Sequence, residues 1–233
     1  MNDYLSLQDA DELAAETAEI ANGPAFGQML TGIIRHPAVM LKEVLAHHDT
    51  VHAVVLSAAG GIYWAVNFSI AQAIGESVPL ATLLGSVVLG GALGGIAYLY
   101  ALSILMYWSS DVLGGQPTRP KVRSLLAVAG IPGIIALLLF GIPRILLFGQ
   151  SLFLPDRAWL DASPLLVWGL WFGDAVCFSW SLTLVVRGLK IMNGFTTTRA
   201  AVAAVLPAAP IVLIGILFVA IAWTGIFFAP PAF

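Results

Sequence analysis

Long apolar runs, separated by short polar or glycine- and proline-rich breaks, dominate this sequence. Long stretches such as residues 78–107 and 200–233 contain no Lys, Arg, Asp or Glu at all. They exceed the roughly 20 residues that a helix needs to cross the hydrocarbon core of a bilayer. We therefore expect an all-α, polytopic membrane protein with about five transmembrane helices. The predicted spans are residues 51–73, 79–107, 124–148, 163–187 and 201–228.

The third run differs from the others because it contains two prolines, Pro132 and Pro143. Proline removes a backbone hydrogen bond inside a helix and tends to kink it. Membrane helices tolerate such a break when neighbouring groups satisfy the freed carbonyls. A kinked or re-entrant third segment is therefore an alternative to a simple crossing, and it would move the C-terminus to the other side.

Before the first run the pattern changes from continuous to amphipathic. Within residues 24–49, apolar positions recur at near-helical spacing, interrupted at Pro37 and mixed with charged residues. The pattern predicts one or two amphipathic helices lying in the membrane interface; the alternative is a helical hairpin packed on the loops of the bundle. We expect residues 1–23 to form an acidic, disordered tail and residues 50–233 to form the transmembrane domain.

Composition supports the membrane interpretation. Of the 233 residues, 59% are hydrophobic and 10% are charged, against roughly 25% charged residues in an ordinary globular domain. The acidic N-terminus lacks the positive region of a secretory signal, so we expect the first span to be retained. Cys177 is the single cysteine, which excludes an intramolecular disulfide.

The basic residues predict an orientation, because short loops rich in Lys and Arg stay in the cytoplasm. Only Arg144 and Arg157 belong to the opposite side of the predicted topology, so we expect a cytoplasmic N-terminus and an external C-terminus. The cytoplasmic set is Arg35, Lys42, Arg119, Lys121, Arg123, Arg187, Lys190 and Arg199.

Asp174 is the sharpest candidate for a functional residue, because it lies deep within the fourth predicted span. A carboxylate there costs about 2.5–3.5 kcal/mol on insertion scales unless it faces a cavity or a partner. It could line an ion or proton pathway, or it could be paired structurally. Candidate partners are Arg144 of the third span and polar side chains such as Asn67.

Two further features concern packing and the membrane surface. Gly90 with Gly94, and Gly91 with Gly95, repeat the small-residue spacing that lets membrane helices approach closely, either within one chain or between copies. The loop before the third span carries Arg119, Lys121 and Arg123, which we expect to contact anionic lipid headgroups.

No motif in the sequence indicates catalysis of the kind found in soluble enzymes. The sequence has no GxSxG elbow, no phosphate-binding GxxxxGK[ST] loop, no HExxH and no paired carboxylates in a polar setting. His48 and His52 stand four residues apart and could bind a transition metal, but they also fit a polar collar at the start of the first span. We therefore expect no enzyme activity, no cofactor and no metal.

The order and spacing of three segments resemble the Yip domain family of Ypt-interacting membrane proteins, in its bacterial branch. The segments are Ile34-Arg35-His36-Pro37, residues 114–132 and residues 180–200. The resemblance covers most of the chain after Phe26 and implies five membrane helices with a cytoplasmic N-terminal region. Eukaryotic relatives are associated with Rab-type GTPases, but their long N-terminal region is reduced here to about 45 residues, so that partner is not carried over.

These observations lead to one expected function and one alternative. We expect a scaffold or adaptor that acts in a membrane complex, or in membrane organisation and trafficking, in a bacterial inner membrane. Its partners would be the lipid bilayer and other membrane proteins or copies of itself, with no nucleic acid. The alternative is a small transporter or channel built around Asp174, Arg144 and the proline-broken third span.

Overall fold

The computed structural model describes residues 24–47, 49–76, 78–156 and 164–209, and every regular element within these ranges is helical. The chain is thus all-α, as predicted. In order, the elements are α2 (Phe26–Arg35), α3 (Pro37–His47), α4 (Thr50–Ala71), η1 (Ile74–Glu76), α5 (Leu80–Val112), α6 (Arg119–Ala129), α7 (Ile131–Ala136), η2 (Leu137–Gly141), α8 (Ile142–Phe148), η3 (Gly149–Phe153), α10 (Pro164–Asn193) and α11 (Thr197–Val205).

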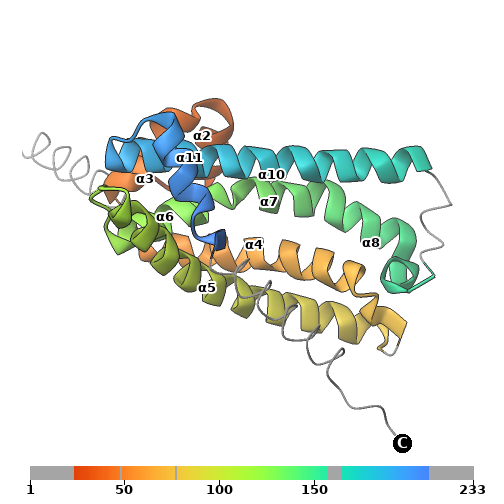
Figure 1. The fold of residues 1–233 in the computed structure, drawn as a ribbon. Coiled ribbons are helices and arrows are strands. Elements are labelled where there is room, and N and C mark those ends of the chain that lie inside the picture. The colour runs from red at the N-terminus through yellow and green to blue at the C-terminus, as the bar shows by residue number, and fades with distance from the viewer. Residues whose placement is uncertain (1–23, 48, 77, 157–163, 210–233) are drawn as a thin grey trace, which may run out of the picture.

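Four helical segments within the described ranges are long and apolar enough to cross a membrane: α4, α5, the continuous stretch Arg119–Phe153, and α10. They correspond to the first four predicted spans and run side by side in Figure 1. The fifth predicted span lies largely outside the described residues, which contain only its first part, in and just after α11. The bundle is therefore multi-pass, and a count of five stays a prediction.

The two ends of the bundle differ. One end, which we call the α3 end, gathers α2, α3, the start of α6 and α11 (Figure 1). The opposite end, the η3 end, contains η1 and η3, which pack on each other. At 1.5 Å per residue, α5 is about 50 Å long, against a hydrocarbon core of about 30 Å. Long helices thus extend beyond the apolar layer.

The outer surface of the bundle is apolar. Large hydrophobic side chains point outward on all four spanning segments, including Phe68 on α4, which is 61% exposed. Leu93 on α5, Leu146 on α8 and Phe172 on α10 are 70%, 79% and 71% exposed. A protein in water rarely exposes contiguous apolar surface on this scale. Lipid tails are the solvent that such a surface fits, which agrees with the membrane assignment.

Glycines set the contact between α4 and α5. A Cβ atom on Gly91 would lie 2.8 Å from the Ile62 Cα, and one on Gly95 would lie 2.8 Å from the Gly61 Cα. These backbones therefore approach as closely as glycine allows. In contrast, Gly90 and Gly94 have no described residue within 4 Å of a built Cβ, and both are exposed on α5. The sequence did not single out Gly61, which completes the contact from α4.

The α2–α3 hairpin packs on the bundle. Ile33, Leu41 and Leu45 are buried and belong to the same apolar core as Leu125 of α6 and Leu189 of α10. The hairpin thus packs on the helices α6 and α10, whereas the alternative in the sequence analysis had it packed on the loops of the bundle. Contact of the hairpin with lipid headgroups stays a prediction, and the acidic segment 1–23 lies outside the described residues.

The third span is a chain of short helical pieces. α6 ends at Ala129, α7 begins at Ile131, and one turn of π-helix, η2, separates α7 from α8. Pro132 and Pro143 each occupy the first turn of a piece, where the missing N–H costs least. The stretch nevertheless reads as one membrane span. The prolines therefore break the helix into pieces while the segment remains long enough to cross.

Candidate functional site: a buried ion pair inside the bundle

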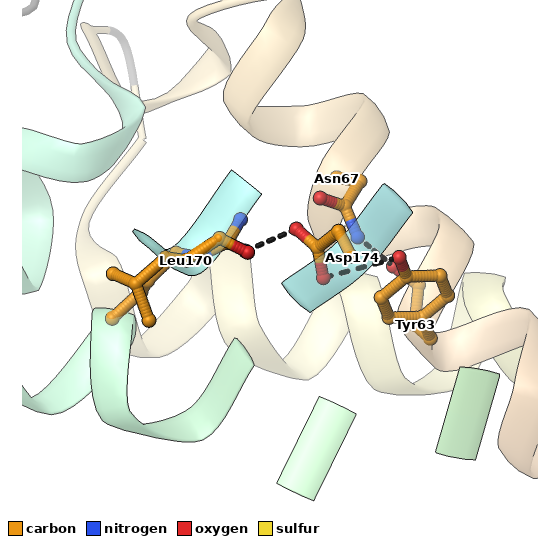
Figure 2. A network of polar contacts seen from close by, with 5 residues as sticks. Tyr63, Asn67, Leu170 and Asp174 are labelled. Atoms are coloured by element: carbon orange, nitrogen blue, oxygen red, sulfur yellow. Dashed lines mark hydrogen bonds and ion pairs between the residues drawn. The ribbon is translucent and has the colours of Figure 1, made fainter. Parts of the chain in front are cut away.

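Three spans bring charged and polar side chains together in the interior. Arg144, in the first turn of α8, forms an ion pair with Asp174 of α10 through its Nη2 and the Oδ2 atom. The Tyr63 hydroxyl of α4 donates a hydrogen bond of 3.3 Å to the other carboxylate oxygen, Oδ1. Figure 2 shows Asp174 turned toward Tyr63. The carboxylate is thus held by one cation and one hydroxyl from two other segments.

Burial makes this arrangement energetically important. The side chain of Arg144 is 4% exposed and that of Asp174 is 17% exposed. Arg144 Nη2 also donates to the backbone carbonyl of Leu170 at 3.2 Å, whereas its Nε is buried without a partner among the described residues. Either charge alone would be costly at this depth, so the two are retained together as a neutral unit.

Local sequence explains how the three segments approach. Gly173, next to Asp174, leaves room for the Phe140 ring of η2, which a Cβ at this position would meet. Gly133 of α7 likewise faces the Tyr63 ring, with its built Cβ 3.4 Å from a ring carbon. Gly173 thus lets the Phe140 ring lie against α10 beside the ion pair, whereas Gly133 and the Tyr63 ring are in ordinary van der Waals contact.

The predicted site residues are placed as follows. Asp174 and Arg144 meet, as one of the alternatives expected, but Asn67 does not bind Asp174. The Asn67 amide instead donates to the carbonyl of Tyr63, one turn earlier on α4, at 3.0 Å (Figure 2). Sequence reasoning missed Tyr63. Its spacing of four residues from Asn67 was the available signal, since both lie on one face of the helix.

A separate cavity lies at the α3 end and does not include the ion pair. Its empty volume is about 300 Å³, counting open space at its mouth. The polar part of its lining is His47, Asp49, His52 and Ser124, and the rest is apolar. Neither Arg144 nor Asp174 is among the described residues that line this cavity.

The histidine candidates for a metal site take structural roles where they are described. Asp49 caps α4 by accepting from the Val51 N–H at 2.7 Å, and its Oδ2 lies 2.7 Å from His52 Nδ1. Burial raises the pKa of the Asp49 carboxyl, but the Val51 hydrogen bond and the His52 contact outweigh burial and hold the pKa below its ordinary value. No group of three or more metal-ligating residues occurs among the described residues, and His48 lies outside them.

The basic residues predicted in a surface loop belong to a helix. Arg119 begins α6, so Lys121 and Arg123 lie in its first turns. The Arg119 guanidinium lies 5.5 Å from the Tyr107 ring centre, and that of Arg123 lies 5.2 Å from the Tyr100 ring centre. These cation–π contacts hold two arginines against α5, while a role in lipid binding stays a prediction.

Comparison with known proteins gives one match. The family model of the Yip1 domain matches residues 31–224, which is most of the chain. The matched range begins in α2 and includes all four described spans, together with the residues of the ion pair. No curated protein matches the chain, and no solved structure does.

Proposed function

Because this chain belongs to the Yip1 domain family, we propose that it is a non-enzymatic scaffold or adaptor in a membrane complex, or in membrane organisation and trafficking. The observation that carries this proposal is that the carboxylate of Asp174, which lies within the membrane-spanning helix α10, already has two partners. Arg144 forms an ion pair with Asp174, and the Tyr63 hydroxyl donates a hydrogen bond to it. A transport site would need that carboxylate to exchange its partners with a solute or an ion.

The open glycine face of α5 supports an assembly role. Gly91 and Gly95 contact α4, whereas Gly90 and Gly94 are exposed and have no neighbour within 4 Å among the residues that the structure describes. Small residues on a lipid-facing helix allow close contact with a helix of another membrane protein or another copy. This face, which we call the Gly90/Gly94 face, is the surface through which we propose that the protein assembles.

Substituting leucine for Gly94 should remove a co-purifying partner without unfolding the protein. The added side chain enters open space in the isolated chain but would separate two closely packed helices in a complex. Native purification followed by mass spectrometry of retained proteins measures the loss. Gly85→Leu is the matched control, because Gly85 also has open space and lies about 140° around the helix from Gly90 at 100° per residue. Equal retention in wild type and Gly94→Leu would contradict this surface.

We infer that the α3 end faces the cytoplasm of a bacterial inner membrane. Eight basic residues lie at this end, namely Arg35, Lys42, Arg119, Lys121, Arg123, Arg187, Lys190 and Arg199. Among the described residues, Arg144 is the one basic residue outside this set, and it is paired with Asp174 inside the bundle. The positive-inside rule favours this orientation. The resemblance to the bacterial branch of the family supports the bacterial location.

Cysteine labelling tests the orientation. In a Cys177→Ala background, Glu76→Cys at the η3 end should react with a membrane-impermeant maleimide in intact cells. Thr118→Cys at the α3 end should react only after permeabilisation, because both side chains are exposed but lie at opposite ends. A reporter fused after Phe233 should be external if the fifth span crosses. The reverse labelling pattern would contradict the orientation, and a cytoplasmic reporter would contradict the fifth span.

The second candidate is a small transporter or channel, favoured by one specific observation. η2 is a turn of π-helix directly before the piece that carries Arg144, and such turns are frequent at functional sites. A rearrangement there could free Asp174. Loss of solute or ion flux in Asp174→Asn proteoliposomes, with the fold retained by circular dichroism, would favour transport over the scaffold.

A further inference from the structure

The α3 end carries a strong excess of positive charge. We use the term basic surface for its eight Lys and Arg residues, which come from α2, α3, α6, α10 and α11: Arg35, Lys42, Arg119, Lys121, Arg123, Arg187, Lys190 and Arg199. The described residues of the same end include three carboxylates, Glu43, Asp49 and Asp111. Eight positive and three negative charges leave a formal excess of five.

These basic side chains have no carboxylate partner within the part of the chain that the structure describes. Their recorded contacts are uncharged. Three arginines lie over aromatic rings, and Lys190 Nζ donates to the Thr197 hydroxyl at 3.1 Å. Six of the eight are exposed. The basic surface is therefore free to attract a negatively charged group.

The chain supplies a matching negative segment next to this surface. Residues 1–23 contain six carboxylates and no Lys or Arg, so their side-chain charge is −6 against the surface's +5. The described structure begins directly afterwards, at Pro24, and enters α2, which belongs to the α3 end. The carboxylates are Asp3, Asp9, Asp11, Glu12, Glu16 and Glu19.

We propose that residues 1–23 dock on the basic surface of their own chain and cover it against other anionic groups. At about 3.3–3.6 Å per residue, a segment of this length reaches at most about 80 Å, and packed helices lie about 8–10 Å apart. The segment can therefore reach across several helices of the α3 end. Tethering raises its effective concentration, which favours it over a free competitor.

The proposal implies a docking contact that is governed by salt. Single ion pairs at a protein surface are weak, so the segment is held by the number of charges and by its tether. Such a contact is screened when the Debye length shortens. Docking of residues 1–23 depends on the distribution of charge, and it does not require a partner at the Gly90/Gly94 face.

Carbodiimide cross-linking tests the contact, because this reagent joins carboxylates to amines without a spacer. All three lysines of the chain, Lys42, Lys121 and Lys190, belong to the basic surface. We expect amide cross-links between carboxylates of residues 1–23 and these lysines in the full-length chain, in phosphatidylcholine nanodiscs. Glu76 and Asp156, at the η3 end, are internal controls that should give none. Cross-link yield should fall by more than about tenfold when salt of about 1 M shortens the Debye length to about 3 Å.

Three results would overturn the proposal. The first is the absence of cross-links from residues 1–23, or their persistence at high salt. The second is cross-links found only between chains when isotopically labelled and unlabelled protein are mixed before reconstitution, which would assign the surface to a second copy. The third is loss of the cross-links in nanodiscs that contain phosphatidylglycerol, which would assign the surface to anionic lipid. If native purification recovered no partner, the assembly proposal would fail, but none of these cross-linking results would change.

Discussion

Replacing Asp174 with alanine should lower the free energy of unfolding by about 3–5 kcal/mol, which is the usual cost of removing one partner of a buried ion pair. Arg144 is 4% exposed, so the substitution leaves a buried guanidinium without its counter-ion. The Tyr63 hydroxyl loses its acceptor as well. Reversible unfolding in mixed micelles, followed by circular dichroism, measures the difference.

The double variant Arg144→Met with Asp174→Leu is the decisive control. It removes both charges and keeps apolar volume, and such replacements of buried pairs are often neutral or stabilising. We therefore expect most of the lost stability to return. Glu76→Gln, an exposed site at the η3 end, should stay within about 0.5 kcal/mol of wild type. A double variant as unstable as Asp174→Ala would mean that the charges themselves are required.

The four described spans could be predicted from the length and hydropathy of the apolar runs. A run of apolar residues that exceeds the hydrocarbon thickness has few alternatives to a membrane helix, and α4 (Thr50–Ala71) follows its predicted run within two residues at each end. The ends of α5 and α10 were less accurate, because both helices continue into the polar region at the α3 end. Hydropathy measures the membrane crossing and carries no signal for a helix that extends past it.

The interior site was only partly predictable. The depth of Asp174 marked it as costly, and Arg144 was the one cation on a neighbouring span that could neutralise it. Tyr63 escaped notice because tyrosine is also common at membrane interfaces, so its type alone does not indicate an interior contact. Its hydroxyl reaches Asp174, 111 residues later in the chain, and that contact exists only in three dimensions.

The glycine pairs on α5 likewise could not be assigned to a contact from the sequence alone. Two frames of identical spacing, Gly90 with Gly94 and Gly91 with Gly95, overlap on α5, and neighbouring positions on a helix point about 100° apart. Spacing alone cannot choose between them. The choice follows from Gly61 on α4, whose backbone contacts one frame and not the other.

Leucine at Gly95 and leucine at Gly94 should therefore have opposite consequences for folding. At Gly95 a Cβ would lie 2.8 Å from the Gly61 Cα and also meet the Ser57 carbonyl, all rigid backbone. Separating α4 from α5 should cost about 1–3 kcal/mol or more, as overpacking does. At Gly94 nothing lies within 4 Å, so the added side chain faces lipid and unfolding should change by less than about 0.5 kcal/mol.

Unfolding in mixed micelles measures the stability of both variants. Native purification shows whether each variant still binds a partner. Gly95→Leu should lose stability whether or not a partner is bound, because the clash lies within one chain. Gly94→Leu should keep its stability and lose its partner. Equal destabilisation by the two substitutions would contradict the assignment of one frame to α4 and the other to an external helix. It would also remove the Gly90/Gly94 face as the basis for assembly.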